Sequence, residues 1–109
     1  MPQLALTPAD DGKSFEVDQG DVVVIGLDEN PTTGYRWAVD RRDADILELQ
    51  GSDFSPGTGA GIGGGGRRTL VFKARKAGTA RVQLKLWRDW EGESSTTDRY
   101  AVTLRVRGR

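Results

Sequence analysis

The feature that most constrains the fold is a strict alternation of apolar and polar residues over residues 100–107. Every second residue of this segment is apolar: Tyr100, Val102, Leu104 and Val106. Because successive side chains of a β-strand point to opposite faces, this period of two predicts a strand that buries one face. Residues 69–74 and 80–86 repeat the pattern. The core is therefore expected to be built from half-buried strands.

Shorter strands are expected in the rest of the chain. Residues 21–27 form a nearly continuous β-branched run, typical of a strand covered on much of both faces. Residues 35–39 alternate again and place Trp37 in the core. Three segments predict short strands: residues 4–6, 14–17 and 46–49. A turn around residues 41–45 is the one helical candidate. Seven to eight strands predict an all-β, immunoglobulin-like β-sandwich, with residues 1–109 as a single domain.

The composition excludes most catalytic chemistry. The chain contains no cysteine and no histidine, so disulfides, thiolate and imidazole chemistry and the commonest zinc sites are absent. Carboxylate chemistry stays formally open at Asp40, Asp43 and Asp45, although such a group is typical of a solvated turn. We therefore expect a protein that is not an enzyme and that uses no cofactor or metal.

Charge is balanced overall but is distributed unevenly along the chain. Of the 16 acidic residues, 12 lie before residue 55, whereas 12 of the 16 basic residues lie after it. One interpretation of the basic half is a nucleic-acid face. Its charges alternate with apolar residues, however, which favours acidic strands pairing with basic neighbours across a sheet. We therefore expect no nucleic-acid partner.

Neither a membrane span nor a targeting segment is visible. No segment reaches the ~20 apolar residues of a span, and the first residues lack the charged and apolar regions of a signal peptide. The expectation is a monomer without membrane contact. It is cytoplasmic as written, or periplasmic or secreted if a signal peptide has been removed.

Three connections between the expected strands are candidates for a binding surface: residues 30–35, 57–67 and 87–92. An even number of strands separates each connection from the next, so all three should emerge at the same end of the sandwich. Antibodies bind their antigens through loops arranged in this way. Topology alone therefore predicts a binding surface made of three loops.

The first connection suits a rigid probe. Pro31 fixes its own φ and favours an extended Asn30, while Gly34 permits a positive φ on the return into the next strand. Thr32 and Thr33 present small hydroxyl groups that can hydrogen-bond without bulk. The simpler alternative is an ordinary tight turn.

The other two connections differ in chemistry. The glycine-rich one is not a phosphate-binding loop, because no Gly-Lys-Ser/Thr follows it and a strand comes next. It is either a flexible arm whose backbone amides pair with a partner or a plain surface loop. In the third, Trp87 and Trp90 lie beyond the last inward residue, Leu86, so at least one should be exposed. Tryptophan and arginine are enriched at binding hot spots, so we expect contacts from Trp90 and Arg88, with Trp87 as a possible shield for the loop base.

Taken in order, these loops resemble the chagasin-type inhibitors of papain-like cysteine proteases, a family with an immunoglobulin-like β-sandwich. The first loop matches the family's first motif completely, and the glycine segment matches the second, with Gly64 where alanine is common. Arg88, Asp89 and Trp90 match the Arg-Pro-Trp motif at two of three positions. The residues that this resemblance assigns to protease binding are Asn30, Pro31, Thr32, Thr33, Gly34, Tyr35, Gly63, Gly64, Gly65, Gly66, Arg88, Asp89 and Trp90.

The resemblance implies a tight, reversible inhibitor whose loops form a wedge in the protease cleft. Thr32 and Thr33 would lie against the catalytic cysteine and histidine of the protease, and Trp90 would be the aromatic anchor. Asp89, in place of the family's proline, leaves the backbone freer and adds a charge. The alternative function is a carbohydrate- or surface-binding module that uses the Trp87/Trp90 pair, because aromatic rings also stack on sugars and single-stranded nucleic acids.

Overall fold

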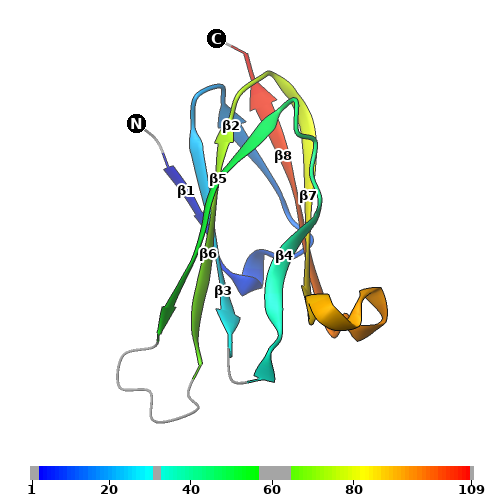
Figure 1. The fold of residues 1–109 in the computed structure, drawn as a ribbon. Helices are drawn as coiled ribbons and strands as arrows, with labels where there is room; N and C mark the ends of the chain where they lie inside the picture. Colours follow the sequence, from blue (N-terminus) through cyan, green and yellow to red (C-terminus); the bar gives the residue numbers. More distant parts are fainter. Residues whose placement is uncertain (1–2, 31–32, 57–64, 109) are drawn as a thin grey trace.

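Two four-stranded sheets pack face to face in the computed structural model, which describes residues 3–30, 33–56 and 65–108 (Figure 1). The first sheet contains, in spatial order, β1 (Gln3–Leu6), β3 (Val22–Glu29), β6 (Gly66–Ala74) and β5 (Leu47–Pro56). The second contains β2 (Ser14–Asp18), β8 (Asp98–Arg107), β7 (Gly78–Trp87) and β4 (Arg36–Arg41). The expected immunoglobulin-like β-sandwich is confirmed.

The core lies between the sheets and follows the alternation of the sequence. Inward residues of the central strands expose almost no surface; Phe72 of β6 and Leu104 of β8 expose none. Trp37 is 6% exposed, which confirms its expected place in the core. Burying one large apolar side chain of this kind stabilises a fold by about 1.5–3 kcal/mol. The alternating strands thus supply the packing that holds the two sheets together.

Two strand pairs are parallel, a feature that the sequence pattern did not indicate. The edge strand β1 runs parallel to β3, and β2 runs parallel to β8. The remaining pairs, such as β3 with β6 and β7 with β8, are antiparallel. Because β1 and β2 belong to different sheets, the start of the chain crosses from one layer to the other and ties them together.

Several local expectations are corrected. The strand expected at residues 46–49 continues as β5 to Pro56, because it resumes its pairing with β6 after an irregularity between Leu49 and Gly51. No helix forms at residues 41–45; β4 runs into this segment, and the N–H groups of Ile46 and Leu47 close a turn on the carbonyl of Asp43.

The helical elements whose whole length is described are short 3-10 turns: η1 (Pro8–Asp10), η3 (Asp89–Glu91) and η4 (Glu93–Ser95). The first begins with a capping box in which Thr7 and Asp10 satisfy each other's backbone N–H groups. None of the helices in the described part is long and apolar enough to cross a membrane.

Acidic and basic residues from the two halves of the chain pair across the second sheet, as expected. Glu16 of β2 lies 3.9 Å from the guanidinium groups of both Arg105 and Arg107 of β8, and Asp18 pairs with Arg107 at 2.9 Å. These pairs are exposed, so each contributes less than about 1 kcal/mol to stability. Acidic residues from the first half of the chain therefore face basic residues from the second.

Candidate functional site

The ends of β3, β5 and β7 lie at the same end of the sandwich, as the strand count predicted (Figure 1). We call this the loop end. The structure describes Asn30 and Thr33–Tyr35 of the first loop, Gly65–Arg67 of the second, and all of the third, which runs from residue 88 to residue 97. Pro31, Thr32, Gly63 and Gly64 lie outside the described residues.

The first loop is closed by bonds of its own. The backbone N–H and the hydroxyl of Thr33 both donate to the carbonyl of Asn30, at 3.2 and 2.8 Å. The same hydroxyl accepts a hydrogen bond from the backbone N–H of Tyr35 at 3.3 Å. The Thr33 hydroxyl, which the sequence suggested as a contact group, is therefore used to shape the loop.

Gly34 is required where the first loop meets the third. Its φ is 80°, in the left-handed region that favours glycine. A Cβ atom at this position would lie 2.6 Å from Cη2 of Trp90, which is closer than carbon atoms can approach. Gly34 therefore allows the turn of the first loop, and its lack of a side chain leaves space for the edge of the Trp90 ring.

Arg88 joins the first and third loops. Its Nη2 and Nε atoms donate to the carbonyl of Thr33 at 2.9 and 3.1 Å, and its guanidinium carbon lies 4.4 Å from the centre of the Tyr35 ring. Glu91 adds a longer ion pair at 3.4 Å. One face of the guanidinium group therefore contacts the Tyr35 ring, and its N–H groups bind the Thr33 carbonyl and Glu91. Arg88 acts as a clamp between loops in this unbound chain.

The two tryptophans of the third loop have different environments. Trp90 is 69% exposed, the one large hydrophobic side chain that is exposed within the described residues. Trp87 is half-buried, and the ammonium group of Lys85 lies 3.7 Å from the centre of its ring. The expectation that at least one of the pair is exposed is confirmed.

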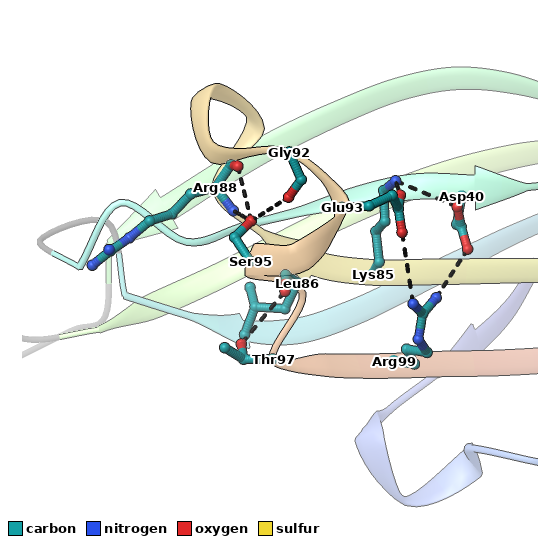
Figure 2. Close-up of polar contacts among 9 residues, drawn as sticks. All are labelled: Asp40, Lys85, Leu86, Arg88, Gly92, Glu93, Ser95, Thr97 and Arg99. Carbon is teal, nitrogen blue, oxygen red and sulfur yellow. Dashed lines mark hydrogen bonds and ion pairs between the residues drawn. The ribbon is translucent and has the colours of Figure 1, made fainter.

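Ser95 fixes the shape of the third loop from within (Figure 2). Its hydroxyl accepts a hydrogen bond from the backbone N–H of Arg88 at 3.0 Å. It lies 2.9 Å from the carbonyl of Arg88 and 2.6 Å from that of Gly92, to which it donates. Gly92 has a φ of 82°, so the chain can turn back between η3 and η4.

A buried ion pair connects the strands at the base of the loop end. Glu29 accepts hydrogen bonds from Nε and Nη2 of Arg68 at 3.2 and 2.7 Å, and from the backbone N–H of Trp37 at 2.7 Å. The side chains of Glu29 and Arg68 are 2% and 11% exposed. Glu29 immediately precedes the first loop and Arg68 follows the second, so this pair connects the bases of both. No local sequence pattern indicates this pair.

The second loop returns against the first. A Cβ atom on Gly65 would lie 3.4 Å from the carbonyl oxygen of Glu29 and 4.0 Å from Cβ of Asn30. Gly66 pairs with Glu29 as β6 begins. The described ends of the two loops therefore lie side by side and line a shared hollow.

A cluster of four charged residues joins the third loop to the outer face of the second sheet (Figure 2). Lys85 forms ion pairs with Glu93 and with Asp40, the latter at 3.4 Å. Arg99 contacts the same two carboxylates, at 3.1 Å for Asp40 and 3.7 Å for Glu93. The hydrogen bond to Glu93 raises the pKa of Lys85 above its ordinary value. We call these four residues the ionic cluster.

Comparison with known proteins identifies the kind of molecule that carries this loop end. The family model for the chagasin family peptidase inhibitor I42 matches residues 16–104 of this sequence. Chagasin of Trypanosoma cruzi is 30% identical over 106 residues, covering 93% of this chain and 96% of that protein.

Solved structures agree with the sequence comparison. A cysteine protease inhibitor from Entamoeba histolytica superposes with a TM-score of 0.86 at 24% identity, over 96% of each chain. The protein called ICP from Leishmania mexicana gives a TM-score of 0.67 at 30% identity, over 90% of each chain. The first shows that the fold is shared, and the second agrees in both fold and sequence. With the family match spanning most of its length, this chain belongs to the chagasin family of peptidase inhibitors.

Proposed function

We propose that this chain inhibits papain-like cysteine proteases by filling their active-site cleft with the loop end. Its membership of a peptidase inhibitor family supports this function, as does the description of the Entamoeba structure as a cysteine protease inhibitor. The observation that carries the proposed mode of binding is the exposure of Trp90 at the tip of a loop that is otherwise fixed. An exposed aromatic ring on a preorganised support is the usual form of a binding hot spot.

The clamp between loops supports tight binding. Association loses less conformational entropy when the contact groups already hold their bound positions. Arg88 fixes the carbonyl of Thr33 relative to the third loop, and Gly34 holds the edge of the Trp90 ring. The two loops therefore meet the protease as one surface. A protease–inhibitor interface of standard size buries roughly 1,600 Å² in total.

The proposed role of the chain is non-catalytic and non-covalent. The chain has no cysteine with which to form a mixed disulfide with the protease. The first loop, with Thr32 and Thr33, would occlude the catalytic cysteine sterically. The second loop, with residues Gly63–Gly66, and the third, with Arg88–Trp90, would contact the cleft on either side.

The carbohydrate-binding alternative loses its main support in the structure. It needed Trp87 and Trp90 as a stacking pair, but Lys85 covers the Trp87 ring and leaves Trp90 as the exposed member. The inhibitor function uses the observed arrangement of a single exposed anchor.

Titration of the purified chain against papain tests the proposal. We expect competitive and reversible inhibition. We also expect binding to persist when the catalytic cysteine of papain has been replaced by alanine, because no covalent bond to it is required and the smaller side chain cannot obstruct the first loop. Absence of inhibition at micromolar concentration would refute the function, and loss of binding to the alanine variant of the protease would refute the non-covalent mode.

A further inference from the structure

The third loop lacks an anchor in the apolar core. Neither η3 nor η4 contains a buried residue, and the Trp90 ring between the loop ends is largely exposed. Ser95 holds the loop in shape, but its partners, Arg88 and Gly92, lie in the same loop. Between its two strand ends, the position of the loop on the sandwich therefore depends on contacts with other elements.

Thr97, at the junction with β8, donates from its backbone N–H and its hydroxyl to the carbonyl of Leu86 in β7. Before that junction, one polar contact to another element is present at each half of the loop. Arg88, before η3, reaches across to the carbonyl of Thr33 in the first loop. Glu93, in η4, reaches the outer face of the second sheet, where it meets Lys85 of β7 and Arg99 of β8. The first contact belongs to the clamp described above. The second has no part in the motifs that define the family resemblance.

Lys85 is unusual because it points away from the core and yet is only 7% exposed. The Trp87 ring, Asp40 and Glu93 together cover its ammonium group. A charge removed from water in this way is tolerated only when it is paired. If the loop moves away, Lys85 keeps Asp40 at 3.4 Å but loses Glu93. The covered lysine therefore favours the arrangement in which η4 is docked on the sheet.

We propose that Lys85 and Glu93 are positioning residues, whose ion pair docks η4 on β7 and β8 and thereby sets where the third loop presents Trp90 to the protease. This inference rests on the proposed function. Arg99 strengthens the docking because it contacts both carboxylates, so the ionic cluster is neutral and each cation has two acidic partners. Asp40 connects it to β4, which places three strands of the sheet under the loop.

The test compares the inhibition constants of Lys85→Met and Glu93→Gln with that of the wild-type chain, using papain. Each variant should weaken inhibition about three- to tenfold, the scale of a networked ion pair. Lys85 is too buried to touch a protease, so any effect of Lys85→Met on inhibition must come from a change in the position of the third loop. Glu48→Gln is the matched control, because it removes the same charge and a 2.7 Å ion pair with Arg75 at the opposite end of the sandwich. Its inhibition constant should equal that of the wild type.

Two further measurements separate positioning from direct contact. In a Trp90→Ala background, Glu93→Gln should have no additional effect on inhibition, because the docked loop then has no anchor to present. Without any protease, hydrogen exchange of the amides of residues 89–96 should be faster in Glu93→Gln than in the wild type, and unchanged in Glu48→Gln. Glu93 is exposed, so these two measurements remain available even if Lys85→Met does not fold.

The outcomes distinguish the two proposals. A wild-type chain that does not inhibit papain overturns the proposed function, while faster exchange in Glu93→Gln still supports docking of the loop by the cluster. Inhibition within twofold of wild type in both variants, with unchanged exchange, overturns the positioning role. An effect of Glu93→Gln that persists in full in the Trp90→Ala background also overturns it, because Glu93 then contacts the protease itself.

Discussion

The two ends of the sandwich are built from different kinds of contact. At the end opposite the loop end, backbone–backbone bonds join separate strands and turns: the N–H of Gln19 donates to the carbonyl of Arg107, that of Gly20 to Ala74, and that of Arg75 to Ile46. Side chains such as Asp21 and Gln19 add to these bonds. At the loop end, side chains perform this role: Arg88 binds the Thr33 carbonyl, Glu29 binds the Trp37 N–H, and Ser95 closes the third loop.

This difference shows how a binding surface can vary while the fold is kept. Backbone bonds form with almost any sequence, so the far end mainly serves stability. The loop end depends on a few side chains, so its shape can be altered by single substitutions. We therefore expect changes at the loop end to act chiefly on inhibition and changes at the far end to act chiefly on stability. The buried pair under the loops is the expected exception.

The buried ion pair should make the loop end important for stability as well as for inhibition. Arg68→Met should lower the free energy of unfolding by about 3–5 kcal/mol, because it leaves the buried carboxylate of Glu29 without its charged partner. Urea denaturation measures the change. Adding Glu29→Gln should recover most of the loss, since the amide oxygen can still accept from the Trp37 N–H. A loss below about 1 kcal/mol in the single variant would mean that the loop end contributes little to the stability of the fold.

At Trp90, by contrast, a substitution should change inhibition and leave stability intact. Trp90→Ala should raise the inhibition constant against papain by at least about 30-fold, which corresponds to the 2 kcal/mol or more of a hot-spot residue. Its free energy of unfolding should stay within about 0.5 kcal/mol of wild type, because the ring is exposed. Trp90→Phe should fall between the two. A weakening of less than threefold in Trp90→Ala would remove Trp90 from the role of anchor.

Arg88→Lys tests the clamp, with an expected five- to thirtyfold weakening of inhibition, or about 1–2 kcal/mol. A lysine cannot donate twice to the Thr33 carbonyl while it stacks on Tyr35. The amide resonances of Thr33 and Gly34 should shift in the free variant. Arg41→Lys, at an exposed arginine at the end of β4, is the control and should leave both readouts unchanged. Equal inhibition by Arg88→Lys and wild type would show that the clamp is dispensable.

At the end opposite the loop end, Asp21→Ala should lower stability and leave inhibition unchanged. The carboxylate of Asp21 is buried and accepts from the N–H of Asp18 at 2.8 Å, which holds the turn between β2 and β3. Its loss should cost about 1 kcal/mol of stability by leaving that donor unpaired. Inhibition of papain at a temperature well below the unfolding midpoint should equal that of wild type. A change in the inhibition constant there would show that the two ends are coupled.

The sequence predicted those parts of the structure that depend on local periodicity. The alternation over residues 100–107 and 80–86 identified the central strands β8 and β7 and their buried faces. This was possible because the order of apolar and polar residues within one strand shows which of its faces is buried. Counting strands then placed the three loops at one end. The extension of β5 was missed because its residues beyond Leu49 are mostly polar and lie on an edge strand.

The contacts that shape the site could not be found in this way. Arg88 and Thr33 are 55 residues apart, and Glu29 and Arg68 are 39 apart, so no local pattern connects them. The sequence singled out Arg88 as a contact residue, but its part in holding the first loop follows only from the packing of the two loops. The 3-10 turns η3 and η4 are too short and polar to show a helical period. The one turn with a readable signal is η1, where Thr7 and Asp10 have the spacing of a capping box.

The smallest expected effect concerns the backbone at Asp89, where the family motif has proline. Arg88 is extended, with φ −102° and ψ 112°, which is close to the conformation that a following proline requires. Asp89 begins η3, the position at which proline is best tolerated in a helical turn, and within the described part of the chain its backbone N–H donates no hydrogen bond. The free chain therefore already has the conformation that proline would impose.

Asp89→Pro should consequently inhibit papain about two- to fivefold more tightly than Asp89→Ala, since it limits the free states of the loop without straining the bound one. The alanine variant is the matched control, because it removes the same charge and leaves the backbone free. Comparison of Asp89→Ala with wild type isolates the effect of the charge. If the proline and alanine variants inhibit equally, then Arg88, Ser95 and the ionic cluster already fix the loop, and the side-chain contacts at the loop end replace the rigidity that proline gives to other members of the family.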